Sequence, residues 1–483
     1  MFLGLDLGTS GLKAILVDET GAITATASAT YENPHPQVGW SEQDPADWVT
    51  ACETVFDVLQ AAAPAGLAAL KGIGLSGHMH GATLIDANDA VLRPCILWND
   101  TRAAEEAAWM DGQPDMRSIT GNIVFPGFTA PKLLWVEKHQ PEVFAKVAKV
   151  LLPKDYLRLW LTGEAIGDMS DCAGTSWLDV GARDWSDQAL ETGHMRRDQM
   201  PDLVEGSAPG GEMRQTLRDR WGITGPVVVA GSAGDNAAAA CGAGCFAEGQ
   251  GFVSLGTSGV LLAAKESYAP DAGSAVHTFC HAVPDRWYQM GVILAATDCL
   301  NWLSRQVGQA PADLIGLLPE TPDGPSDLLF LPYLSGERTP HNDASVRGAF
   351  IGLDVGHTAA DLTQAVVEGV SFALRDCMAA LGGTGTTLTS VLAMGGGARS
   401  AYWRSTLATV LDLPLDVPSG GEFGAALGAA RLGITAATGA NPSDVMKPPR
   451  VGETVTPNTA LTAAYAEKWN TYRVAYRALS ALR

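Results

Sequence analysis

One short motif occurs in both halves of the sequence, and this repeat constrains the fold more than any other feature. The segment Leu-Gly-Thr-Ser-Gly spans residues 7–11 (the first loop) and returns at 255–259 (the second loop). Each copy lies between two apolar runs, a pattern that predicts a strand, a tight turn and a second strand. An internal repeat indicates two related structural units. We therefore expect two α/β domains that join near residues 240–250.

Chain length and residue periodicity agree with this division. A single core rarely grows past about 250–300 residues, whereas this chain has 483. The apolar run 391–394 predicts a strand, while apolar residues at steps of three and four predict helices over 361–381 and 461–479. Thr358 and Asp361 have capping-box spacing at the start of the first of these helices. Strands that alternate with helices indicate the α/β class.

The first loop is suited to binding phosphate. It contains four small residues, Gly8, Thr9, Ser10 and Gly11. Such residues let the backbone approach an anion, and successive N–H groups can surround its oxygens. Lys13 adds a positive charge, and Asp6 supplies a carboxylate that can hold Mg²⁺ directly or through a water molecule. A single such loop is also typical of an ordinary β-turn, because its spacing differs from that of a P-loop.

The second loop favours the nucleotide interpretation, since two domains with facing phosphate loops form a clamp. Gly256 and Thr257 repeat the glycine and threonine of the first loop, but Ser254 occupies the position that Asp6 has there. Only the first loop therefore offers a carboxylate for a metal ion. A third glycine-rich turn contains Gly396 and Gly397 between a predicted strand and a predicted helix. This suits a phosphate or nucleoside, although triple glycine also occurs in ordinary turns.

An acid and an amide follow another strand-like run. The apolar residues 227–230 lead into small residues and then Asp235 and Asn236. Phosphorylation of a sugar hydroxyl requires a base within hydrogen-bond reach, a role that suits Asp235. Asn236 is suited to fix a neighbouring hydroxyl. The alternative is that Asp235 is the N-cap of the alanine-rich helix that follows, and both roles are compatible.

Two histidine pairs have a superficial likeness to metal sites. His78 and His80 lie two residues apart, as a pair without a third nearby ligand, and such a pair is weak evidence for zinc. His277 and His281 flank a phenylalanine in a run that is more typical of a buried strand. We expect no zinc site at either pair.

Net charge, cysteine content and the lack of long apolar runs indicate which partners and which cellular location to expect. The formal net charge of −21 disfavours nucleic acids and anionic membranes. The eight cysteines include no C-x-x-C pair, which is typical of a reducing compartment. The N-terminus lacks the basic region of a signal peptide, and no apolar run reaches the length of a transmembrane helix. A cytoplasmic location is therefore expected.

Taken in order along the chain, the motifs resemble the FGGY family of carbohydrate kinases. Besides the two loops, they are 77–81 (GHMHG), 96–100 (ILWND), 127–132 (GFTAPK), 152–156 (LPKDY), 234–236 (GDN), 331–340 (LPYLSGERTP) and 395–399 (GGGAR). No single motif is decisive, but their succession from residue 1 to about residue 435 is highly specific. The resemblance implies two ribonuclease-H-like, actin-like ATPase domains with a catalytic cleft between them. It assigns residues 1–243 to a sugar-binding domain and 244–483 to a nucleotide-binding domain.

The resemblance also implies roles for individual residues. Asp235 matches the catalytic base of the family, and Asp6 matches the acid needed for Mg-ATP. Met79 and His80 match the sugar-contacting pair, and Asn236 matches a contact to a sugar hydroxyl. The positions matching nucleotide contacts are Thr9, Ser10, Lys13, Gly256, Thr257, Gly396 and Gly397, with Gly8 and Gly11 completing the first loop.

The activity that the resemblance implies is ATP-dependent phosphorylation of D-xylulose, with Mg²⁺ as cofactor. In glycerol-phosphorylating members the pair that matches Met79 and His80 is Arg-Glu, which argues against glycerol. Ribulose, fuculose and gluconate stay open as alternative acceptors, because fold does not choose among them. A sugar sensor without catalysis is a further alternative, but Asp235 and Asp6 are both present. A homodimer is one assembly that we consider for such a chain.

Overall fold

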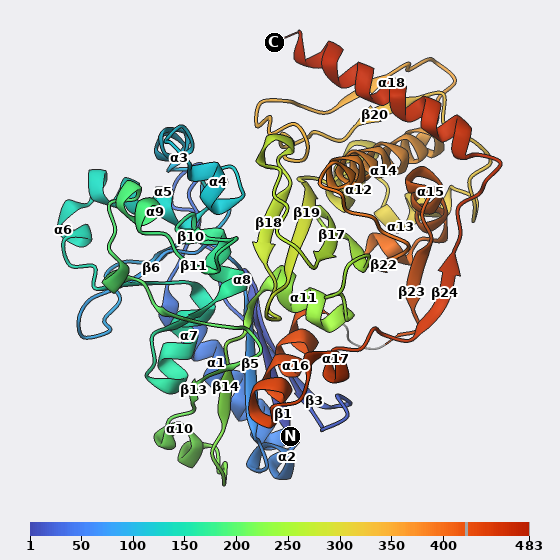
Figure 1. Cartoon of the computed structure of the whole chain (residues 1–483). Coiled ribbons are helices and arrows are strands. Elements are labelled where there is room, and N and C mark those ends of the chain that lie inside the picture. The colour runs from blue at the N-terminus through green and yellow to red at the C-terminus, as the bar shows by residue number, and fades with distance from the viewer. Residues whose placement is uncertain (421–423, 483) are drawn as a thin grey trace.

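The chain forms two α/β units, each built on a seven-stranded sheet, in a computed structural model that describes residues 1–420 and 424–482 (Figure 1). The first sheet has the order β13-β14-β5-β1-β2-β3, with β15 paired to β5. Its strands are β1 (Phe2–Leu7), β2 (Gly11–Val17), β3 (Ile23–Thr30), β5 (Gly72–Gly77), β13 (Pro209–Glu212), β14 (Val228–Ala230) and β15 (Ala233–Gly234). The second sheet has the order β18-β19-β17-β16-β22-β23-β24. Its strands are β16 (Gly251–Leu255), β17 (Gly259–Lys265), β18 (His277–Cys280), β19 (Trp287–Ile293), β22 (Val391–Met394), β23 (Leu415–Pro418) and β24 (Val451–Val455).

The repeated motif occupies the same place in both sheets. In each copy the loop joins two antiparallel strands, β1 to β2 and β16 to β17. The first strand of each pair also has a parallel neighbour, β5 or β22. The prediction of strand, turn and strand at both loops, and of two related α/β units, is therefore confirmed.

Both helices that apolar periodicity predicts, over 361–381 and 461–479, are present, and further helices also pack on the sheets. The longer helices are α1 (Pro45–Ala62), α5 (Thr129–His139), α7 (Pro153–Thr162), α11 (Asp235–Ala243), α12 (Thr297–Val307), α14 (Ala359–Gly383), α15 (Ala401–Leu411), α16 (Ala425–Thr438) and α18 (Thr462–Ser480). The capping box of Thr358 and Asp361 is present at the start of α14. At α18 the predicted inward face is anchored by Tyr465 and Tyr472, which are fully buried. No described helix combines the length and apolar character needed to cross a bilayer.

The two units are not separate in space, because α16 crosses back to the first sheet. Figure 1 shows this orange-red helix beside the blue strands β1 and β5. Glycines make the close approach possible: a Cβ on Gly74 would lie 1.8 Å from the carbonyl oxygen of Ala429. Where α16 crosses α11, a Cβ on Gly428 would lie 1.7 Å from the oxygen of Ala238. The predicted domain boundary between residues 243 and 244 stays a prediction, because α11 before it and α16 after it pack against each other.

Strand register gathers the functional motifs at one edge of the first sheet. Asp6 on β1 is level with Ser76 on β5, and Gly77 is level with Gly234 on β15. These three strands are parallel, so their carboxyl ends meet at that edge, where ligands typically bind in such sheets. The segments that follow them are the first loop, the Met79–His80 pair and Asp235.

Candidate active site

A cavity of about 280 Å³ lies between the two units. From the first unit it is lined by Met79, His80, Trp98, Phe125, Gly127, Phe128, Asp235 and Asn236. From the second it is lined by Ser258, Val260, His277, Met290, Val292 and Arg338. The structure therefore brings four residues predicted to handle the sugar into one cavity, and that cavity reaches the second loop through Ser258.

His80 is held rigidly at the cavity wall. Its backbone is left-handed (φ 71°), and Thr129 Oγ1 and Lys132 Nζ donate to its carbonyl oxygen at 3.1 and 2.8 Å. The imidazole stacks on Phe128 with ring centroids 4.4 Å apart, and its Nδ1 lies 2.7 Å from the oxygen of Gly174. A Cβ on Gly174 would come within 2.4 Å of the ring, so glycine is required there.

The contacts of His80 also define its hydrogen-bonding state. Burial, followed by the charge of Lys132, lowers the pKa of His80 to about 3, so the ring is neutral at physiological pH. A carbonyl oxygen can only accept, hence Nδ1 carries the proton that His80 donates to Gly174. The other nitrogen, Nε2, is therefore an acceptor available for a hydroxyl group.

Asp235 begins α11 at the same edge of the sheet. Its Oδ1 accepts hydrogen bonds from the backbone N and from Nδ2 of Asn236, at 2.7 and 2.9 Å. The N-cap of α11 is Gly234, so Asp235 is the first helical residue and the N-cap interpretation is wrong. Burial, with a smaller contribution from the charge of Asp6, raises the pKa of Asp235 to about 6. Such a carboxylate is suited to accept a proton near neutral pH.

A buried ionic cluster supports the backbone that leads to Asp235. Lys154 Nζ lies 2.6 Å from Asp168 Oδ1 and 3.3 Å from Asp171 Oδ2, and all three side chains are fully buried. Asp168 also accepts from the hydroxyl of Ser170, whose oxygen in turn accepts from the backbone N of Gly234 at 3.2 Å. Sequence reasoning missed this cluster, because its members become neighbours only in the fold.

The first loop is tied to the cavity wall. Gly8 N donates to Gly11 O at 2.9 Å, which closes the turn. Thr9 accepts at its hydroxyl from Trp98 Nε1 (3.0 Å) and at its carbonyl from Gln43 Nε2 (2.6 Å). Ser10 and Lys13 are exposed, with Lys13 opposite Asp6 in the strand pair.

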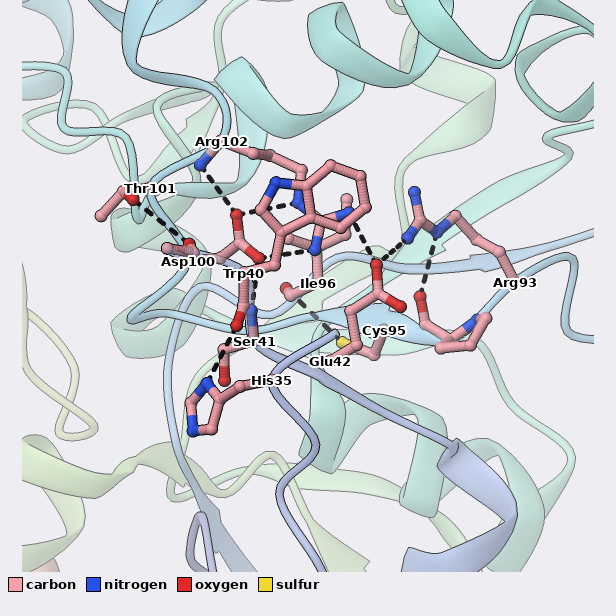
Figure 2. A network of polar contacts seen from close by, with 12 residues as sticks. His35, Trp40, Ser41, Glu42, Arg93, Cys95, Ile96, Asp100, Thr101 and Arg102 are labelled. Carbon is pink, nitrogen blue, oxygen red and sulfur yellow. Dashed lines mark hydrogen bonds and ion pairs between the residues drawn. The ribbon is translucent and has the colours of Figure 1, made fainter. Parts of the chain in front are cut away.

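An ionic network fixes the segment that carries Trp98. Arg102 pairs with Asp100 through two hydrogen bonds of 2.9 and 2.6 Å, and both side chains are 1% exposed. Figure 2 shows the carboxylate of Glu42 between Arg102 and Arg93, while the Arg102 guanidinium lies 3.6 Å above the ring of Trp40. The segment that contains Gln43 and the segment that contains Trp98 both hydrogen-bond to Thr9, and the buried ion pairs join these two segments to each other.

The second loop and the third glycine-rich turn meet at the carboxyl ends of β16 and β22. The carbonyl of Gly256 accepts from the N and Oγ1 of Thr297, at 2.9 and 2.8 Å. Gly395 has φ 87°, and a Cβ there would lie 2.6 Å from Leu255 O. Thr257 and Gly396 are exposed, so this edge presents open backbone to a ligand.

Several cavity residues were not singled out from the sequence. Arg338 and Phe128 lie within quoted family motifs, whereas Phe125 has no signal of its own. His277 packs in parallel on Phe279, with ring centroids 5.4 Å apart. Among residues 1–420 and 424–482 no group of three or more His, Cys, Asp or Glu side chains is arranged to hold a metal ion.

Comparison with known proteins agrees with this architecture. Residues 1–242 match the N-terminal domain model of the FGGY family of carbohydrate kinases, and residues 251–437 match its C-terminal domain model. The chain is 46% identical to the xylulose kinase of Escherichia coli K12, over 99% of each chain. It superposes with a TM-score of 0.99 on a xyloylose kinase from Brucella ovis (56% identity, 100% of both chains). The xylulose kinase from Rhodospirillum rubrum gives a TM-score of 0.92 at 29% identity, over 100% of this chain and 99% of that one. Two domain models and near-complete coverage of a curated relative lead to one conclusion: the chain belongs to the FGGY family of carbohydrate kinases.

Proposed function

We propose that this chain transfers the γ-phosphoryl group of ATP to the terminal hydroxyl of D-xylulose, giving D-xylulose 5-phosphate and ADP. A carbohydrate kinase is a phosphotransferase, and the family implies ATP as donor and a sugar as acceptor. The names of the relatives support D-xylulose as that sugar. The observation that carries the proposal is the position of Asp235, which lines the cavity with a pKa raised to about 6 by burial.

Asp235 is the proposed catalytic base. Its carboxylate accepts the proton of the terminal hydroxyl while that oxygen attacks the γ-phosphorus and the bond to ADP breaks. The hydrogen bonds from Asn236 hold one carboxylate oxygen, Oδ1, and no hydrogen bond from the described part of the chain holds Oδ2, which can therefore face the acceptor. Because little covalent chemistry falls to the protein in phosphoryl transfer, placement of the two reactants provides most of the rate enhancement.

Asp6 is the proposed ligand for Mg²⁺ that arrives with ATP. Magnesium usually binds one or two carboxylates together with substrate phosphates and water. Asp6 fits this role because its negative charge acts on Asp235 across the sheet edge, and a cation there offsets that repulsion. When bound, the ion supplies charge neutralisation for the phosphate oxygens. Nucleotide contacts are assigned to the two loops and the third turn, through Gly8, Thr9, Ser10, Gly11, Lys13, Gly256, Thr257, Gly396 and Gly397.

Met79, His80 and Asn236 are the proposed sugar contacts. Met79 is packed by Tyr288, whose hydroxyl lies 3.8 Å from the Met79 sulfur, and it lines the cavity as an apolar wall. His80 Nε2 accepts from a sugar hydroxyl, since its other nitrogen is committed to Gly174. We also propose a cytoplasmic location, which suits eight cysteines that are all buried and unpaired.

The test is ADP release with purified protein, ATP and Mg²⁺ against ketopentoses, polyols and sugar acids. We expect the highest kcat/KM with D-xylulose. A higher value with ribulose, a polyol or gluconate overturns the assignment of the acceptor, and ADP release that no sugar stimulates overturns the kinase assignment itself.

A further inference from the structure

An arginine of the second unit, Arg338, lines the cavity in which we propose that the sugar binds. It follows β20 (Leu329–Leu331) in the chain. Its guanidinium lies 4.4 Å from the ring centroid of Phe125, and its Nη1 lies 3.5 Å from His277 Nε2. Among the described residues, no carboxylate forms a salt bridge with it.

The neighbouring acid, Glu337, accepts hydrogen bonds from backbone N–H groups and forms no salt bridge with the Arg338 side chain among the described residues. Glu337 Oε1 is occupied by the backbone N–H groups of Leu294 and Arg338, at 3.1 and 2.7 Å. Burial raises the pKa of Glu337 to about 8, so this side chain is largely neutral at pH 7. Burial lowers the pKa of Arg338 to about 10, which leaves the guanidinium charged. A guanidinium has five N–H donors and no acceptor, and the contact from Nη1 to His277 Nε2 uses only one of them, so a ligand that offers a lone pair can accept from the others.

Arg338 and the base are held by different parts of the cavity wall: Arg338 lies against Phe125 and His277, whereas Asp235 follows Gly234, where a Cβ would lie 2.8 Å from Met79. The charge of Arg338 is close enough to lower the pKa of His80 and of His277, after the larger effect of burial. For Asp235 the perturbing charge is instead that of Asp6. A sugar whose terminal hydroxyl meets Asp235 can therefore direct another of its oxygens toward Arg338.

We infer that Arg338 is a specificity-determining residue that donates its guanidinium hydrogen bonds to the carbonyl oxygen at C2 of a 2-ketose. This inference rests on the proposed function and deepens it. A carbonyl oxygen only accepts and a guanidinium only donates, so the two are complementary. His80 Nε2 then serves the hydroxyl beside the carbonyl.

The same geometry discriminates against the corresponding polyols. Reduction of D-xylulose at C2 gives xylitol or D-arabitol, in which a hydroxyl replaces the carbonyl. That hydroxyl carries a proton which also needs an acceptor. Among the described residues around Arg338, His80 Nε2 provides one acceptor, while His277 Nε2 already faces Arg338. Two neighbouring hydroxyls therefore compete for one site, and a buried donor left unpaired weakens binding.

The test compares ligands that differ only at C2. Dissociation constants of D-xylulose, xylitol and D-arabitol are measured by calorimetry, without nucleotide, for the wild type, Arg338→Met and Arg338→Lys. We expect Arg338→Met to weaken D-xylulose binding about 10- to 100-fold, the range for a lost charge-assisted hydrogen bond, while the two polyols change little. Arg338→Lys keeps the positive charge but lacks the planar set of N–H donors of a guanidinium, and we expect an intermediate loss of affinity for D-xylulose.

Arg347→Met is the matched control, because Arg347 lies nine positions further along the same segment, is exposed and bonds only to nearby carbonyls in the described structure. Thermal unfolding checks that each variant folds, and Arg338→Lys carries the test if Arg338→Met does not fold.

Equal loss of affinity for all three ligands in Arg338→Met, or unchanged affinity for D-xylulose, overturns the inference while the kinase proposal stands. A wild type that prefers a polyol overturns both.

Discussion

The indole Nε1 of Trp98 donates a 3.0 Å hydrogen bond to the hydroxyl of Thr9. Trp98 lines the sugar cavity, and Thr9 belongs to the first loop, so one bond joins the acceptor side of the site to the phosphate side. The backbone of Trp98 is also closely packed, since a Cβ on Gly127 would lie 2.1 Å from its carbonyl oxygen. The cavity wall therefore positions the loop.

Trp98→Phe tests this coupling. Phenylalanine keeps the apolar wall but removes the donor, so the Thr9 hydroxyl loses its fixed orientation. We expect the KM for ATP to rise about 3- to 10-fold, the range of a net hydrogen bond, with a smaller change in the KM for the sugar. Trp109→Phe is the control, because Trp109 is similarly exposed (48% against 47%) but lies outside the residues that line the cavity. An unchanged KM for ATP in Trp98→Phe contradicts the coupling.

Asp235→Asn tests the base. The amide is isosteric but cannot accept the proton, so we expect kcat to fall by about 10²- to 10⁴-fold, the usual contribution of general base catalysis. The dissociation constant for ATP, measured by calorimetry, should stay close to that of the wild type. Near-normal turnover in this variant removes Asp235 from the mechanism.

The pH profile provides an independent test of the same residue. Asp235 must be deprotonated to act, and burial raises its pKa to about 6. We therefore expect kcat/KM for the sugar to be constant above that pH and to fall about tenfold per unit below it. A profile that stays flat down to pH 5 is incompatible with Asp235 as the base.

Asp6→Asn should alter the metal dependence. The amide is a weaker ligand for a hard cation, so the Mg²⁺ concentration for half-maximal rate rises and kcat falls about 10²-fold or more. Because the charge of Asp6 helps to raise the pKa of Asp235, the acid limb of the pH profile should also move to lower pH. Unchanged magnesium dependence excludes the proposed role of Asp6.

Local patterns in the sequence predict local structure well here, and contacts between distant segments poorly. The repeat predicts both loops because strand, turn and strand are determined by neighbouring residues. Arg338 carries no local signal that it lines the same cavity as His80, more than 250 positions earlier. The packing of α16 on the first sheet could not be predicted from the sequence either. Nothing in the residues around Gly74 and Gly428 indicates that another backbone segment approaches them closely.

Gly74→Ala tests that packing. The added Cβ would lie 1.8 Å from Ala429 O and 2.7 Å from its carbonyl carbon, and neither backbone atom can rotate away. The helix α16 must therefore move off the sheet, and overpacking of this kind costs about 1–3 kcal/mol or more. The control is Gly382→Ala near the end of α14, where nothing lies within 4 Å of the new Cβ. There alanine should stabilise the helix by up to about 1 kcal/mol. The midpoint of thermal unfolding should therefore fall for Gly74→Ala and rise for Gly382→Ala, because only the first glycine is required by its contacts. Equal shifts would show that the approach of α16 to the sheet tolerates a methyl group.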